Sequence, residues 1–157
     1  MSHLKRFEMP RNWPMPRKGT AYVIKPLANL SNSIPLLILM RNMLNIARNR
    51  NEVKRSVHLR QILLNTKPVK DEKIGICLFD TISIIPLKKN YRISLSEKGK
   101  FNIQDINESE SNYKVAKIIN KRILKGKKIQ LNLSDGKNFL SDLKCHVNDS
   151  VIINLKE

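Results

Sequence analysis

The sequence is poor in aromatic residues and cysteine, and it has no long apolar run. Aromatic side chains make up 5% of its 157 residues, which argues against a sheet of aromatics as the main means of binding nucleic-acid bases. Its two cysteines, Cys77 and Cys145, offer no disulfide framework and indicate a reduced, cytoplasmic environment. The longest apolar run, residues 34–40, is far shorter than a membrane span, and the N-terminus has no apolar signal core. Neither a membrane protein nor a secreted protein is therefore expected.

The residue types that usually perform catalysis or bind metals are not arranged for either task. Cys145-His146 is an isolated dipeptide, and His3, His58 and Cys77 lack paired metal-ligand spacing. Cys77 is expected to be a small buried hydrophobe. There is no Gly-rich phosphate loop and no recognisable pair of carboxylates. The sequence therefore indicates no enzyme, no metal, no cofactor and no small-molecule substrate.

Positive charge is what the sequence has in excess. It contains 30 Lys and Arg against 13 Asp and Glu, which gives a net charge of +17. Because 41% of the residues are hydrophobic, the chain can bury a core and is not a disordered basic tail. Such a charge implies a polyanionic partner, either nucleic acid or an acidic membrane surface. Residues 1–60 hold 12 Lys and Arg against 2 Asp and Glu, so this part should make most of the contacts.

Residues 34–85 have the pattern of two short basic helices followed by a β-hairpin. Apolar residues at helical spacing predict a first helix over residues 35–47, with Pro35 in its first turn and Ser33 as its cap. The cations and amide expected on its outer face are Arg41, Asn45 and Arg48.

The second helix is expected to begin after Asn49, because Asn49 and Glu52 have the spacing of a capping box. Val53 and Val57 should point inward. The row expected on the opposite side is Arg50, Lys54, Arg55 and His58. Like charges this close on a helix repel one another, so an external anion would stabilise the row.

The period of the pattern then changes from helical to strand-like. Asn65-Thr66 stands between residues 62–64 and residues 67–70, which predicts a hairpin turn. Residues 74–85 should supply the strand that closes the unit.

The first thirty residues are basic and interrupted by four prolines. We expect an extended arm that cannot bury its own surface, with Lys5, Arg6, Arg11, Arg17 and Lys18 as its cations. Trp13 has two interpretations, stacking on a base or anchoring the arm in the core, and a lone Trp is more often an anchor.

From residue 87 onward the pattern is β-rich and predicts a second small domain. The basic cluster over residues 121–128 is either a second, looser binding patch or a solvated turn. The expected fold is therefore α+β: a basic N-terminal arm (1–30), a helix–helix–β-hairpin RNA-binding domain (31–86) and a small, mostly β domain (87–157).

Two groups of residues resemble known ribosomal proteins. The run Asn49 to Arg55, with the hairpin and Asp80-Thr81-Ile82-Ser83-Ile84, resembles the small RNA-binding motif first known from ribosomal protein four of the small subunit. The opening His3-Leu4-Lys5-Arg6, with Pro10 and Trp13, is similar to that of the e-type ribosomal protein four of archaea and eukaryotes. Further matches in order and spacing extend this resemblance over nearly the whole chain. That family usually continues into a Gly-rich C-terminal β-barrel, which this sequence does not contain.

The resemblance implies a structural constituent of the small ribosomal subunit in the cytoplasm, with small-subunit rRNA and neighbouring ribosomal proteins as partners. The residues expected to hold phosphates are Lys5, Arg6, Arg11, Arg17, Lys18, Arg41, Arg48, Arg50, Lys54, Arg55, Arg60, Lys67 and Lys70. Two other functions stay open: a free-standing tRNA- or ribosome-binding factor, and an accessory RNA-binding module of an RNA-modifying system.

Overall fold

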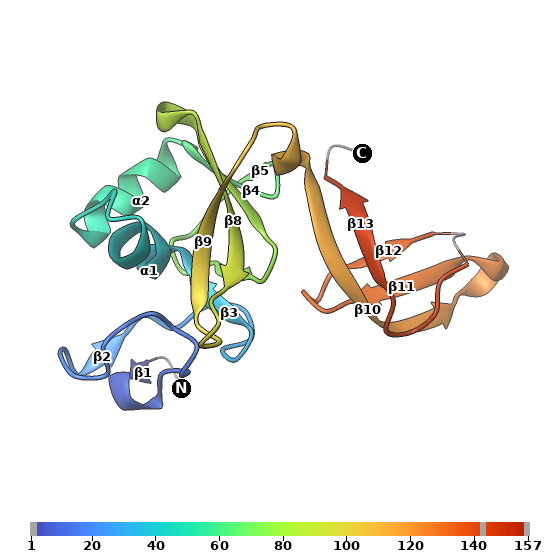
Figure 1. Cartoon of the computed structure of the whole chain (residues 1–157), viewed down its shortest axis with the longest axis horizontal. Helices are drawn as coiled ribbons and strands as arrows, with labels where there is room; N and C mark the ends of the chain where they lie inside the picture. Colours follow the sequence, from blue (N-terminus) through green and yellow to red (C-terminus); the bar gives the residue numbers. More distant parts are fainter. Residues whose placement is uncertain (1–2, 142–143, 156–157) are drawn as a thin grey trace.

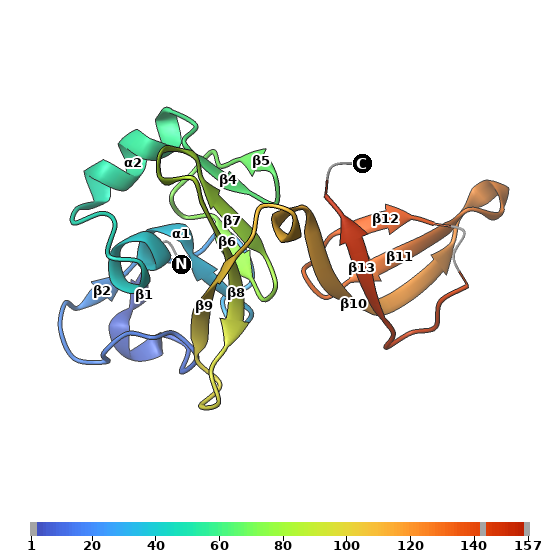
Figure 2. The same cartoon turned by 45° about the horizontal axis from the view of Figure 1, so that its top comes forward.

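The computed structural model describes residues 3–141 and 144–155, which form two lobes lying side by side along the long axis (Figures 1 and 2). The first lobe comprises residues 3–106 and contains the helices. The second lobe comprises the described residues from 113 onward and is a single small sheet. A short segment around η4 (Glu110–Asn112) joins them.

The first lobe is built on a five-stranded antiparallel sheet in the order β5-β4-β7-β8-β9. Its strands are β4 (Ile62–Leu64), β5 (Lys67–Pro68), β7 (Thr81–Ile84), β8 (Lys89–Leu95) and β9 (Phe101–Ile106). In β8 the side chains alternate, so that Tyr91 and Ile93 are buried. The short turn η3 (Ile85–Leu87) connects β7 to β8.

Two helical segments and two short strand pairs complete the first lobe. The helices are α1 (Leu36–Ile38), which continues into the π-helical η2 (Leu39–Met43), and α2 (Arg50–His58). The strand pairs are β1 (Leu4–Lys5) with β2 (Tyr22–Val23), and β3 (Ser33–Pro35) with β6 (Gly75–Cys77). Another short turn, η1 (Arg6–Glu8), follows β1. Apart from η1, which has no buried residue, these elements contribute to one hydrophobic core.

The second lobe is a four-stranded antiparallel sheet in the order β12-β11-β10-β13. Its elements are β10 (Tyr113–Ile123), η5 (Lys125–Lys127), β11 (Ile129–Leu133), β12 (Asn138–Leu140) and β13 (Ser150–Asn154). Among the described residues its core has four buried hydrophobic side chains: Ala116, Ile118, Leu131 and Leu133.

The predicted domain boundary at residue 87 does not match this arrangement. Strands β8 and β9 pair with the first-lobe sheet, and the second sheet begins only at Tyr113. The short η3 connection explains the difference, because a tight turn brings the next strand back beside β7. The pattern of apolar and polar residues identifies strands, but it does not reveal which sheet a strand joins.

The N-terminal segment is not an extended arm. Leu4, Met9, Trp13 and Met15 are buried in the first-lobe core, although they lie just before or between the prolines that suggested an irregular extension. The Trp13 indole is 1% exposed and donates a hydrogen bond from Nε1 to the carbonyl oxygen of Ser33 at 3.0 Å. The core-anchor interpretation of Trp13 is therefore confirmed, and the base-stacking interpretation is wrong.

The first helix is shorter than predicted. It ends at Met43, and Asn45 has a left-handed φ of 53°, which a helix does not accommodate. Arg48 therefore lies beyond the helix and does not share a face with Arg41. Ser33 is not a cap either, because its hydroxyl donates to the carbonyl oxygen of Asn29.

The second helix begins after Asn49 and buries Val53 and Val57, as predicted. The predicted capping box is wrong. Glu52 Oε2 accepts a hydrogen bond from the backbone amide of Arg48 at 2.7 Å, and the Asn49 side chain makes no capping bond.

The predicted hairpin turn is confirmed. Asn65 and Thr66 both have positive φ, as a type I′ turn requires. Thr66 adopts this conformation without the freedom of glycine.

Replacing Trp13 with Ala should lower the free energy of unfolding by about 3–5 kcal/mol, because it leaves a large cavity in the first-lobe core. Trp13→Phe, which keeps a ring but loses the bond to Ser33, should cost less. Urea denaturation followed by circular dichroism measures both. Phe7→Ala is the matched control, since Phe7 is 65% exposed. If Trp13→Ala unfolded at the parent's midpoint, the segment would not be part of the core.

Candidate nucleic-acid interface

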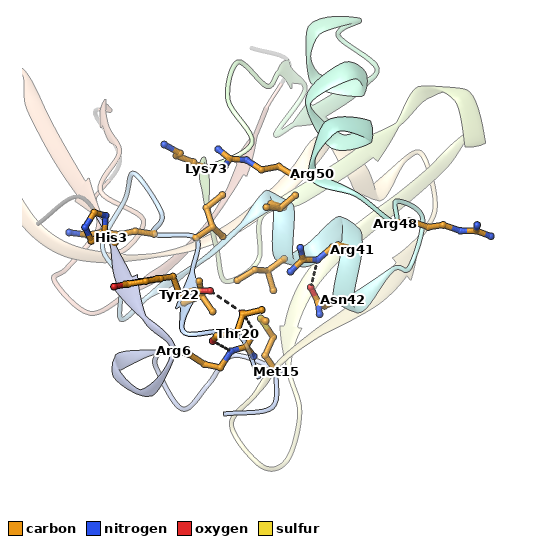
Figure 3. A pocket seen from close by; sticks show the side chains of 15 residues that line it. His3, Arg6, Met15, Thr20, Tyr22, Arg41, Asn42, Arg48, Arg50 and Lys73 are labelled. Atoms are coloured by element: carbon orange, nitrogen blue, oxygen red, sulfur yellow. Dashed lines mark hydrogen bonds between the residues drawn. The ribbon is translucent and has the colours of Figure 1, made fainter. Parts of the chain in front are cut away.

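A groove of about 820 Å³ opens between the N-terminal segment, the α1–η2 helix and the start of α2 (Figure 3). Six cationic residues line it: Arg6, Lys25, Arg41, Arg48, Arg50 and Lys73. None of the described residues that line it is acidic. We call this feature the cationic groove. Its positive lining is suited to an anionic ligand.

The walls of the groove come from segments that are far apart in the sequence. Strand pairing of β1 with β2 brings Arg6 and Tyr22 together on one side. The loop before β6 runs beside α1, where the carbonyl oxygens of Ile74 and Glu72 accept the amides of Leu36 and Leu37. These bonds satisfy donors that a helix start leaves unpaired. They also place Lys73 at the edge of the groove.

Arg6 is held in one orientation by the loop that follows it. Its Nε donates to the Thr20 carbonyl oxygen at 2.8 Å, its Nη2 to the Thr20 hydroxyl at 2.7 Å, and its Nη1 to the Pro16 carbonyl oxygen at 2.8 Å. Gly19 packs against the guanidinium, and a Cβ there would lie 3.2 Å from Cζ. A guanidinium has five N–H donors, so these three bonds leave two for a ligand.

Arg50 has a protein partner that the sequence prediction did not foresee. Its Nε and Nη2 donate to Glu72 Oε1 at 3.0 and 2.6 Å. Burial alone would raise the pKa of Glu72, but the hydrogen bond from Arg50 and a backbone hydrogen bond lower it below its usual value. The anion that stabilises Arg50 on α2 is therefore an internal carboxylate.

The other predicted cations fall into three groups. In the cationic groove, Arg41 donates from Nε to Asn42 Oδ1 at 3.1 Å, while Arg48 extends away from the other side chains (Figure 3). Arg17 is tied to the carbonyl oxygens of Phe7 and Met9. The remaining cations are exposed outside the groove: Lys5, Arg11, Lys18, Lys54, Arg55, Arg60, Lys67 and Lys70.

Sequence reasoning did not identify Tyr22, Lys25 and Lys73 as interface candidates. They are single residues in segments without a motif, and only long-range pairing brings them to the groove. No signal in the sequence alone could have grouped them.

A buried ion cluster joins the two lobes. Lys114 Nζ on β10 donates to Asp80 Oδ1 in the first lobe and to Asp135 Oδ2 in the second, each at 2.5 Å. Asp80 also accepts the Asn65 side-chain amide at 2.7 Å and the Cys77 backbone amide at 2.7 Å. Asp80, which accepts a bond from Asn65 of the predicted turn, therefore connects the first lobe to Lys114 of the second.

The charges in this cluster stabilise one another. Burial alone would lower the pKa of Lys114, but the charge of Asp80 and hydrogen bonds to both carboxylates raise it. Burial alone would raise the pKa of Asp135, but the hydrogen bond from Lys114 and a backbone bond from Lys137 lower it. Lys114 is 2% exposed, so it is not a candidate for nucleic-acid contact.

The described residues offer little support for other kinds of site. They contain no group of three His, Cys, Asp or Glu side chains close enough to hold a metal ion. Cys77 is half-buried rather than fully buried, and burial raises the pKa of its thiol to about 11. No helix in the described ranges combines the length and apolar character needed to cross a membrane.

Comparison with known proteins finds similarity to one ribosomal family. The model described as ribosomal family S4e matches residues 87–157. The small ribosomal subunit protein eS4 of Methanospirillum hungatei is 39% identical over 99% of this chain and 65% of its own length. The protein of the same name from Methanocella arvoryzae is 36% identical over 99% of this chain and 67% of its own length. The chain thus spans about two thirds of the length of these relatives.

The fold also resembles that of a solved structure. The crystal structure of the 30S ribosomal protein S4e from Thermoplasma acidophilum aligns with a TM-score of 0.68 at 24% identity, over 81% of this chain and 66% of that chain. Both have the same mixed, strand-rich fold with few helices.

Replacing Lys114 with Met should destabilise the chain by about 3–5 kcal/mol, because it leaves Asp80 and Asp135 buried without their cation. Since the folded-state pKa of Lys114 is raised, its contribution is fully present below pH 10.5 and is lost as pH rises through the folded value. Since the folded-state pKa of Asp135 is lowered, the contribution of Asp135 to stability is present above pH 3.8 and is lost as pH falls through the folded value. Urea unfolding at a series of pH values measures both effects.

The control for this variant removes the carboxylate charges as well. Lys114→Met combined with Asp80→Asn and Asp135→Asn should recover part of the loss, because no uncompensated charge stays buried. Equal unfolding free energies for the parent and Lys114→Met would contradict the ion cluster.

Proposed function

The chain belongs to ribosomal family S4e, and from this premise we propose that it is a structural constituent of the small ribosomal subunit that binds and stabilises folded small-subunit rRNA. The observation that carries the proposal is the similarity over nearly the whole chain to proteins named as components of that subunit. The resemblance inferred from the opening residues and the second helix is thereby confirmed. The proposed role requires no catalysis and no cofactor, and its place is the ribosome in the cytoplasm.

Charge supplies the mechanism of the proposed binding. The exposed cations on α2, Lys54 and Arg55, and those on the hairpin, Lys67 and Lys70, can reach phosphates without breaking a described bond to the protein. Contacts of this kind fix the position of a protein on RNA and do not read its bases. Specificity then comes from the tertiary shape of the folded RNA.

The helix–hairpin unit within residues 31–86 is the proposed centre of rRNA contact, and the N-terminal segment adds a second wall through the cationic groove. This segment acts as part of the folded lobe, because Trp13 and Met15 are buried. The second lobe, fixed by Lys114, extends the chain towards neighbouring ribosomal proteins, which are the proposed protein partners.

Affinity for purified small-subunit rRNA should fall with salt, at a slope of about −0.7 to −0.9 in log–log form for each phosphate contacted. Lys54→Ala with Arg55→Ala should weaken binding and make that slope shallower by about 0.7–0.9 for each side chain removed. Filter binding over a series of salt concentrations measures both quantities. The matched control is Lys98→Ala with Lys100→Ala, which removes the same charge from the exposed β8–β9 turn.

Two results would contradict the proposal. One is an affinity that does not change with salt. The other is an equal loss in the test and control variants, which would mean that net charge alone governs binding. Co-sedimentation separates a subunit component from a transient factor: the component stays at constant copy number after a high-salt wash.

A further inference from the structure

We infer that the cationic groove binds an unpaired RNA strand, with one base stacked on Tyr22 and the adjoining phosphates on Arg6 and Arg41. This inference rests on the proposed function and adds a nucleotide subsite to it. It differs from contact with a duplex surface, for which exposed cations are sufficient.

Tyr22 is the aromatic side chain in a position to stack. It lines the groove and is 57% exposed, whereas Trp13 lies in the core. The rings of Tyr22 and His3 pack edge-to-face, with centroids 5.6 Å apart and planes at 70°. Figure 3 shows the pair on one side of the groove, with Arg41 and Asn42 on the other. Edge-to-face packing is a preferred arrangement of two rings, and it leaves more than half of the Tyr22 side chain exposed to a ligand.

The lining of the groove is suited to a base as well as to a phosphate. Apolar side chains, among them Met15, Ile24 and Leu37, line it beside the cations. An aromatic base needs an apolar surface and its phosphate needs cations, and here both occur in one groove. A volume of about 820 Å³ also lies in the range of sites that hold small organic groups.

The arginines of the groove are already oriented. Arg6 is held by Thr20 and Pro16, and Arg41 by Asn42. Each keeps N–H donors that these bonds do not use. Because the side chains are ordered before a ligand arrives, binding costs less conformational entropy.

The chemistry favours an unpaired strand over a duplex. In a duplex the bases are already stacked on each other, and the deep major groove keeps side chains from them. In a single strand the bases are free to stack on aromatic side chains, and such stacking tolerates any sequence. A groove that offers an exposed tyrosine ring and several cations matches the single strand.

The test compares two RNA probes on the full chain: an unpaired RNA of about ten nucleotides and the same strand annealed to its complement. Tyr22→Ala should weaken binding of the unpaired probe about five- to 150-fold, the loss measured when a stacking aromatic is removed. Binding of the duplex should change little, and Tyr22→Phe should retain most of the affinity. The matched control is Phe7→Ala, because Phe7 is an exposed aromatic outside the groove.

A second measurement needs no variant. The parent chain is irradiated with an unpaired RNA that contains 5-iodouridine, which cross-links to an aromatic ring stacked on it, and mass spectrometry locates the cross-linked residue. Cross-linking at Tyr22 is the expected result. Cross-links only elsewhere, or equal losses for Tyr22→Ala and Phe7→Ala, would overturn the inference. If salt-dependent rRNA binding persists in that case, the proposed function stands; if the chain binds no RNA, both fail.

Discussion

The burial of Trp13 is the interaction on which the architecture of the cationic groove depends. Its indole fills the first-lobe core and its Nε1 bonds to Ser33, so the N-terminal segment is held against the helices. In that position β1 pairs with β2, and Arg6 and Tyr22 line the same groove as Arg41. An apolar contact therefore creates a surface whose function is electrostatic.

The structure also separates cations that serve the fold from cations that are available to RNA. Arg17 binds backbone carbonyls, Arg50 binds Glu72, and Lys114 lies between two buried aspartates. The 30 Lys and Arg residues are therefore an upper limit on the cations that the surface can offer to a polyanion. Arg6 belongs to both groups, since its bonds to Thr20 and Pro16 fix its direction without neutralising its charge.

Some local features were predictable from the sequence, and long-range ones were not. The start of α2 and the turn at Asn65-Thr66 follow from residues a few positions apart, and the structure has them as predicted. The Arg50–Glu72 pair spans 22 residues, and no short-range pattern encodes it. The first helix ends early because Asn45 adopts a left-handed conformation, and the spacing of apolar residues does not predict this conformation. The groove is likewise formed by segments that are far apart in the sequence, so only the structure could reveal it.

The small core of the second lobe has a consequence for the order of folding during synthesis. With four buried hydrophobic side chains in its described part, this lobe buries too little apolar surface to be stable alone. Two of its bonds also come from outside it: Asp80 is the second counter-ion of Lys114, beside Asp135, and the Thr66 hydroxyl donates to the Leu155 carbonyl oxygen. Both groups lie in the first lobe, which leaves the translating ribosome earlier. We therefore expect the first lobe to fold first during synthesis and the later strands to assemble on it.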